Sequence, residues 1–574
     1  MTSCRKQVLA VVAATSLAAS LAACGGGGSS PGGTTEGGTL YYYITKPVEH
    51  VDPQRVYVGR DISNLNRLVY RSLVSFPIST DAKTANTPVP DLATDTGTAS
   101  ADAKTWKFTL KDGVTWQDGK DVTCEDVKYG ASRVFATDVI TGGPNYVLSY
   151  LDVPEGKDGL PAYKGPYKRS GQADFDKAVT CQGKTITYHF KKPWPDFNLA
   201  SAALLMMNPF RQDQDKGAKS NFAIFSNGPY KLQGSWEKEK GATLVRNDNY
   251  DPKTDTTKLR KALPDKIVFT IGQPAETIYD RLIADSGNDK FAVTSERTPP
   301  SFYSQIEGEV ADRSVNVESP FVDYLVPNFT SVKNLEVRQA IAMATDASSW
   351  ITAGGGERAY LTARSIVNPA VVGYQDNPSF AAPPSGDPAA AKTLLEEAGV
   401  TIPYPLDFQY PSSETADKQA AGLKQTWEKA GFKVTLDGLG DTYYDVIQKP
   451  DNDGDVMWGS WGADWPSAIT VTAPLFDSRP NGVGVKGATC NGQDYDKYQS
   501  AAFNGLVDRA QSASSLDDQT KALQEADLQL GRDVAYVPLD IQKFNFVRGS
   551  KVTGYVNTPP AAMNPDLGAI GVAK

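Results

Sequence analysis

Strand-like and helix-like segments alternate in the C-terminal half of the chain, and this alternation constrains the fold more than any other feature. The segments are, in order, a strand at 406–410, a helix at 414–430, a strand at 432–436, a helix at 443–447 and a strand at 455–461. Gly431 ends the longer helix, at a position that favours a left-handed residue. Alternating strands and helices joined by short loops form a sheet covered by helices. We therefore predict an α/β fold with a largely parallel or mixed sheet.

Length, charge and histidine content narrow the class of protein. The 574 residues allow several domains, and 58 basic against 67 acidic side chains give a net charge of -9. No run of Lys and Arg interleaved with aromatics could follow a phosphate backbone, so we expect no nucleic-acid partner. The only two histidines, His50 and His189, are too far apart in sequence for an imidazole-based metal site.

Catalytic and metal-binding motifs are missing from the sequence. There is no GxSxG, no P-loop and no third group to complete a histidine triad. Residues 482–487 fit GxGxxG, but they lie in a Pro/Asn/Gly-rich stretch rather than between a strand and a helix. The acids at 451, 453 and 455 lack the later Gly and Glu of a calcium-binding EF-hand loop. We expect no enzymatic activity, no metal and no cofactor.

The N-terminus reads as an export signal followed by a tether. Two basic residues precede an uncharged run, Val8–Ala23, which as a helix would be about 24 Å long, too short to span a bilayer. The run ends in Leu-Ala-Ala-Cys and resembles the cleavage site of bacterial lipoproteins. That resemblance implies that residues 1–23 are a signal peptide and that Cys24 is lipidated. Residues 24–38 are rich in Gly and Ser and form the expected tether.

The segment 106–127 is the most distinctive part of the body. It reads WKFTLKDGVTWQDGKDVTCEDV. It resembles a segment of the family 5 extracellular solute-binding proteins, the oligopeptide and dipeptide receptors of bacterial ABC importers. The resemblance continues, in order, at Val51–Pro53, Val69–Val74, Ser226–Tyr230, Arg246–Tyr250, Val337–Ile341, Ala391–Gly399 and Trp461–Pro466.

This resemblance implies a particular division of the chain. The expected fold is a type II periplasmic-binding-protein-like α/β architecture, in which three domains form two lobes around a ligand cleft. Domain I is discontinuous, domain II is inserted into it, and domain III forms the second lobe. The expected ranges are 39–70, 204–325 and 537–574 for domain I, 71–203 for domain II and 326–536 for domain III.

The resemblance also implies a function. We expect a monomeric, extracytoplasmic protein, held by its lipid at the outer face of the cytoplasmic membrane or on the periplasmic side. It would capture a peptide between two closing lobes and deliver it to ABC permease subunits driven by a cytoplasmic ATPase. Two alternatives stay open: the same scaffold may serve an oligosaccharide or another solute, or it may have a signalling or chaperone role outside transport.

Asp464 is the candidate ligand anchor. It follows an aromatic strand that contains Trp458 and Trp461 and precedes Trp465, so its ionised form is costly unless a cation lies nearby. In peptide-binding members of the family the matching Asp pairs with the ligand's α-amino group. The resemblance therefore implies this role for Asp464.

Five further residues are assigned to the ligand site by resemblance. Tyr57 and Gly59 match a segment that offers backbone groups to an extended ligand, whereas Tyr146, Trp461 and Trp458 match the walls of the pocket. Two positions depart from the peptide receptors. Trp458 stands where some of them have an Arg, and Tyr57 stands where an acid can occur.

Three cysteines remain in the mature chain after Cys4 leaves with the signal peptide and Cys24 is lipidated. An exported protein can form disulfides, but an odd number leaves one thiol without an internal partner. We expect Cys124 to pair with Cys181, because both lie in the N-terminal region. Pairings that involve Cys490 remain open.

Overall fold

A six-stranded mixed sheet forms where the alternating pattern predicted one. The computed structural model describes residues 36–156 and 160–574, so the predicted signal peptide and Cys24 lie outside the described residues. The strand order is β13 (Tyr360–Thr362), β17 (Val537–Val547), β12 (Ser314–Pro327), β16 (Val456–Trp461), β14 (Tyr404–Pro411) and β15 (Phe432–Leu439). Strand β14 is parallel to β15 and β16, whereas β12 is antiparallel to β16 and β17. The prediction of a mixed sheet is confirmed.

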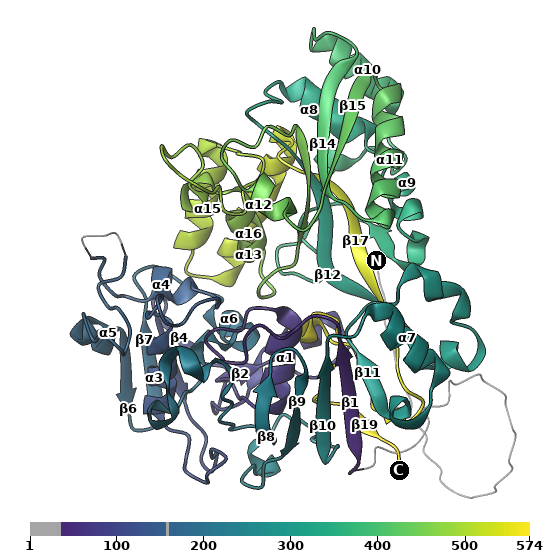
Figure 1. Cartoon of the computed structure of the whole chain (residues 1–574). Coiled ribbons are helices and arrows are strands. Elements are labelled where there is room, and N and C mark those ends of the chain that lie inside the picture. The colour runs from purple at the N-terminus through teal and green to yellow at the C-terminus, as the bar shows by residue number, and fades with distance from the viewer. Residues whose placement is uncertain (1–35, 157–159) are drawn as a thin grey trace, which may run out of the picture. The chain divides into compact units, whose positions relative to one another are not determined.

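Helices cover this sheet. The first set is α8 (Leu335–Ala344), α9 (Ala347–Ala353), α10 (Pro388–Glu397) and α11 (Glu414–Lys429), and α11 packs against β14 and β15 (Figure 1). The second set is α12 (Tyr443–Ile447), α13 (Ile469–Phe476), α14 (Ser478–Asn481), α15 (Ala501–Ser512) and α16 (Leu516–Asp533). Helix α11 buries Leu423 and Trp427 on one face and is therefore amphipathic. We call the six-stranded sheet and its helices lobe B.

Two further sheets form the rest of the described chain, which we call lobe A. A five-stranded sheet has the order β11 (Ala292–Thr294), β1 (Thr39–Ile44), β10 (Lys266–Ile271), β9 (Gly241–Arg246) and β8 (Tyr230–Glu237). A four-stranded sheet has the order β4 (Thr98–Ala99), β5 (Thr105–Thr109), β7 (Thr185–His189) and β6 (Val179–Gln182). Lobe A also contains two strand pairs, β2 (Val74–Ser75) with β3 (Val89–Pro90) and β18 (Val552–Thr553) with β19 (Gly571–Val572). Its helices are α1 (Gly59–Leu68), α2 (Ala82–Ala85), α3 (Cys124–Arg133), α4 (Tyr146–Tyr150), α5 (Gln172–Ala178), α6 (Phe197–Ala203) and α7 (Ala275–Ala284).

Thr123 caps the start of α3, as the sequence Thr-Cys-Glu-Asp at 123–126 predicts, and a disulfide lies beside it. The Thr123 hydroxyl accepts a hydrogen bond from the Asp126 backbone N–H, and the Asp126 carboxylate accepts one from the Thr123 N–H. The first helical residue, Cys124, forms a disulfide with Cys181 on the edge strand β6. Cys490 is exposed and carries a free thiol.

The spacing of apolar residues between Ile62 and Leu73 predicts a helix over 61–74. Helix α1 instead ends at Leu68, because the Arg71 N–H donates to the Asn227 side chain and Val74 enters the pair β2–β3. Strand β12 runs past the expected domain boundary at 325, and β17 begins at Val537, where domain I was expected to resume. They pair with each other over most of their length and run side by side (Figure 1), which places both in the sheet of lobe B.

Among the residues described, no helix is both long and apolar enough to cross a membrane.

Candidate ligand-binding site

Asp464 lies just beyond the end of β16 and is bonded to two tyrosines from lobe A. The Tyr57 hydroxyl donates to Oδ2 of Asp464 at 2.6 Å, and the Tyr146 hydroxyl donates to the same oxygen. The Asp464 backbone N–H donates to the Thr470 hydroxyl at 3.1 Å, which holds the residue against α13. The carboxylate of one lobe is thus positioned by phenols of the other.

Two tyrosines, and no positively charged side chain of the described residues, contact this carboxylate. Burial raises the pKa of Asp464, and the hydrogen bonds from Tyr146 and Tyr57 lower it only in part. No Lys or Arg of ranges 36–156 and 160–574 forms an ion pair with it. Burial also raises the pKa values of Tyr57 and Tyr146, and the charge of Asp464 raises them further, so both phenols remain protonated donors. The site therefore holds an acid without a cationic partner.

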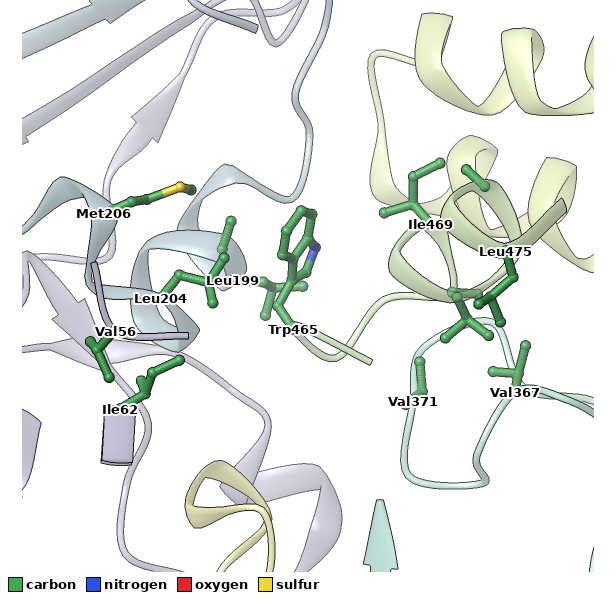
Figure 2. Close-up of a cluster of buried hydrophobic side chains, with 14 of the residues drawn as sticks. Val56, Ile62, Leu199, Leu204, Met206, Val367, Val371, Trp465, Ile469 and Leu475 are labelled. Atoms are coloured by element: carbon green, nitrogen blue, oxygen red, sulfur yellow. The ribbon is translucent and has the colours of Figure 1, made fainter. Parts of the chain in front are cut away.

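Trp465 is the main apolar contact between the lobes at this point. Its indole Nε1 donates to Oδ2 of Asp196 in lobe A at 2.6 Å, and its ring meets the Tyr146 ring edge-on at 4.7 Å. Figure 2 shows the indole reaching beside Leu199 of α6, while Ile469 lies on the side of lobe B. Only 2% of Trp465 is exposed, and 1% of Asp196.

Asp464 faces a pocket of about 470 Å³, which we call the Asp464 pocket. Its wall is mostly apolar and includes Ile62, Phe76, Leu204, Phe321, Val371, Pro320, Pro466, Pro559 and Pro560. Few polar side chains reach it besides Tyr57 and Asp464, namely Asn86 and Ser460. The indole N–H of Trp461 already donates to the Thr470 carbonyl, and that of Trp465 donates to Asp196, so neither is free to bind a ligand.

The start of helix α1 adds backbone donors to the same pocket. Val58 is the N-cap of α1 and makes no side-chain cap, and Gly59 begins the helix. No described residue accepts a hydrogen bond from the N–H groups of Gly59 or Arg60, whereas those of Asp61 and Ile62 bond to the Val58 carbonyl. Free N–H groups at a helix start can receive a ligand's carbonyl or carboxylate oxygens.

A second pocket of about 700 Å³ lies on the other side of Tyr57 and Trp465, and we call it the Lys192 pocket. Its charged groups neutralise one another: Arg479 forms ion pairs with Asp477 and Asp508 at 2.7 and 2.8 Å. The Lys192 ammonium lies 4.2 Å from the centre of the Tyr150 ring and donates to the Gln511 side chain of α15. This pocket is more polar than the Asp464 pocket and also lies between the lobes.

The structure brings together most of the residues predicted for the site. Tyr57, Gly59, Trp461 and Asp464 line the Asp464 pocket, and Tyr146 lines the Lys192 pocket while bonding to Asp464. Trp458 lines neither pocket. Its ring is 6.5 Å from that of Tyr443, on a layer of lobe B away from Asp464.

Sequence reasoning missed several walls of the site. Pro559 and Pro560 return from the C-terminal segment, Asn86 comes from the loop after α2, and Val371 from a loop before α10. The sequence around each of these residues does not indicate a ligand site, because each residue reaches the pocket only when distant segments fold together. A pair of adjacent prolines predicts a turn, but not which cavity the turn will face.

Metal binding has no support in the described ranges, since no group of three or more His, Cys, Asp or Glu side chains there could hold an ion.

Comparison with known protein families shows which family this chain belongs to. Residues 87–482 match the model of the bacterial extracellular solute-binding proteins, family 5, which is more than half of the chain. The chain belongs to this family. Among its relatives, the periplasmic oligopeptide-binding protein OppA of Haemophilus influenzae is 23% identical over 79% of this chain and 80% of its own length. The dipeptide-binding protein of Escherichia coli is 24% identical over 83% of each chain.

Solved structures of the family share the fold. The clavulanic acid biosynthesis oligopeptide binding protein 2 superposes with a TM-score of 0.84 at 24% identity, covering 94% of this chain and 96% of that one. The prediction of a type II periplasmic-binding-protein-like fold is thereby confirmed.

Proposed function

We propose that this family 5 member captures peptides that have a free amino terminus and delivers them to an ABC permease. The observation that carries the proposal is the Asp464 carboxylate, which is half-buried between the lobes and bonded to two phenols but to no Lys or Arg of the described residues. A ligand ammonium would supply the missing positive charge through a charge-assisted hydrogen bond. Relatives named for oligopeptide and dipeptide binding support the same ligand class.

The pocket beside Asp464 favours an apolar residue next to the ligand's amine. Its wall is made of aliphatic, aromatic and proline side chains, and its few polar groups suit one or two hydrogen bonds. A charged ligand side chain there would lose its water without gaining a partner. An oligosaccharide would bring many hydroxyl groups into the same wall, so the peptide is the better fit.

The free N–H groups at the start of α1 complete the scheme. With its ammonium at Asp464, a peptide could place a main-chain carbonyl near Gly59, whose N–H is unpaired among the described residues. Two polar contacts of opposite kind would fix the direction of the ligand, and the apolar wall would accept side chains of different shape.

The role of Asp464 is tested by isothermal titration with trileucine and N-acetyl-trileucine. We expect trileucine to bind, N-acetyl-trileucine to bind poorly, and Asp464→Asn to weaken trileucine binding by about 2 to 5 kcal/mol. Asp453→Asn, on an exposed loop, is the matched control and should leave affinity unchanged. Equal affinity for the two peptides, or no loss in Asp464→Asn, would contradict the proposal.

We also propose that Cys24 carries a lipid that holds the protein at the outer face of the membrane, where capture precedes transport. The support is the Leu-Ala-Ala-Cys sequence after a short uncharged run. Cys24→Ser should move the protein from the membrane fraction to the soluble fraction on cell fractionation, and cells carrying it should take up less labelled trileucine. Retention of the variant in the membrane fraction would rule out the anchor.

A further inference from the structure

Lobe B contains a separate cavity that the peptide site does not use. It has a volume of about 320 Å³, at the lower end of the range for small-molecule sites, and shares no lining residue with the Asp464 or Lys192 pockets. Helices α8 and α10, the end of β13, the segment 379–384 and the entry to β17 enclose it. We call it the Arg364 pocket.

The wall of the Arg364 pocket is apolar over most of its area. Side chains from α8 and α10, the segment 379–384 and the start of β17 contribute Ala342, Met343, Phe380, Pro383, Pro384, Leu394, Val534 and Val537. Such a lining binds the hydrocarbon part of a ligand through the hydrophobic effect. The prolines in the wall offer no backbone N–H, so a ligand that packs against them finds no donor there.

Arg364 is the one charged residue in this lining. Its Nη1 donates to the carbonyl oxygens of Phe380 and Ala382 at 3.3 and 3.5 Å, both near the limit of a hydrogen bond. These contacts orient the guanidinium but do not neutralise its positive charge, since carbonyl groups carry no net charge. No acidic side chain within 36–156 or 160–574 forms an ion pair with Arg364.

Two groups at this pocket retain free hydrogen-bonding capacity. No described residue accepts from Nε or Nη2 of Arg364, and neither atom is among the buried polar atoms that lack a partner, so both are open to solvent. The Gln339 side chain on α8 lines the same cavity and likewise makes no hydrogen bond with a described residue. A guanidinium presents paired N–H donors that match the two oxygens of a carboxylate.

We propose that the Arg364 pocket is a second binding site, for a small monocarboxylate with an apolar body. The carboxylate accepts hydrogen bonds from Nε and Nη2 of Arg364, the Gln339 amide supplies a further donor, and the apolar body packs against Met343, Phe380 and Leu394. The Asp464 site requires an amine and the Arg364 pocket a carboxylate, so a monocarboxylate that lacks an amine is a poor ligand of the Asp464 site.

The test is ligand-observed NMR and calorimetry on the full chain with 3-phenylpropionate as the probe. We expect a dissociation constant of about 1 mM or tighter, and Arg364→Gln should weaken binding about ten-fold or more. The neutral 3-phenylpropionamide should bind wild type more weakly and show no difference between wild type and Arg364→Gln. Arg532→Gln, on the exposed face of α16, is the matched control and should bind the probe as wild type does.

Two further measurements distinguish loss of binding from misfolding and from binding at the peptide site. Ala342→Phe retains the charge but fills the cavity, so it should abolish binding even if Arg364→Gln folds poorly. Saturating trileucine amide, which has the amine but no carboxylate, and the Asp464→Asn variant should leave probe binding unchanged, which makes this result independent of the peptide site. Absence of probe binding to wild type, full binding to Ala342→Phe, or competition by trileucine amide would each overturn the proposal.

Discussion

At the scale of single residues, the electrostatics of Asp464 decide how ligand binding responds to pH. Burial raises the pKa of this carboxyl above its usual value, so the acid takes up a proton at a higher pH than an ordinary Asp does. A protonated Asp464 cannot form an ion pair with an ammonium. Peptide affinity should therefore fall as the pH drops through that raised pKa.

The ligand's own amino group determines how affinity changes at alkaline pH. The α-amino group of a peptide loses its proton near pH ~8, so affinity should fall there too, which makes the profile bell-shaped. Titrations of trileucine from acidic to alkaline pH would check this. In Asp464→Asn the acidic limb should flatten, and an unchanged acidic limb would assign it to another group.

Single residues also show where prediction from sequence fails. Asp464, Tyr57 and Tyr146 are predictable because ordered motifs place them in a known family pattern, and the structure joins them through hydrogen bonds. Trp458 was assigned to the same site, yet it lines neither pocket. Trp458 lies on the same face of β16 as Ser460, which does line the Asp464 pocket, but it is two residues earlier in the strand and packs against Tyr443 instead.

At the scale of elements, local chemistry determines where helices begin more clearly than where they end. Helix α3 begins at Cys124, directly after the predicted cap, because the reciprocal bonds of Thr123 and Asp126 involve only neighbouring residues. Helix α1 ends at Leu68 because residues from distant segments pair with the backbone beyond it. The alternating segments of lobe B were predictable because each carries its own periodicity.

The cap of α3 gives a stability prediction. Thr123→Ala removes the hydroxyl that accepts from the Asp126 N–H, and it should lower the free energy of unfolding by about 1 kcal/mol. Urea titration followed by circular dichroism would measure the change. Thr393→Ala is the control, because this exposed hydroxyl only bonds to a carbonyl within α10, and its effect should stay within about 0.5 kcal/mol. Equal effects of the two substitutions would contradict a capping role.

At the scale of the whole molecule, Trp465 joins lobes A and B at the border of both pockets between them. Trp465 from lobe B is almost fully buried and donates to Asp196, itself buried in lobe A. Such a contact stabilises the closed arrangement whether or not a peptide is present. Its existence could not be predicted from sequence, because the two residues are 269 positions apart.

Replacing this indole tests its part in closure. Trp465→Phe keeps much of the ring but leaves the Asp196 carboxyl without its donor, which should weaken peptide affinity by about 1 to 3 kcal/mol. Trp427→Phe is the matched control, because its indole bonds to the Ile341 carbonyl within lobe B and lines neither pocket, so any loss should be one of stability rather than closure. Small-angle scattering with and without trileucine would compare the two variants. A Trp465→Phe protein that closes like wild type would contradict the inference.

The prolines of the Asp464 pocket have a consequence for ligand chemistry. Pro320, Pro466, Pro559 and Pro560 can accept hydrogen bonds through their carbonyls but cannot donate one, so donors near this wall are concentrated at the start of α1. A bound backbone can satisfy its amide hydrogens along the wall more readily than its oxygens. Thioamide analogues, which stay uncharged and whose sulfur accepts hydrogen bonds more weakly than oxygen, should then be tolerated at every ligand position except the one that faces Gly59.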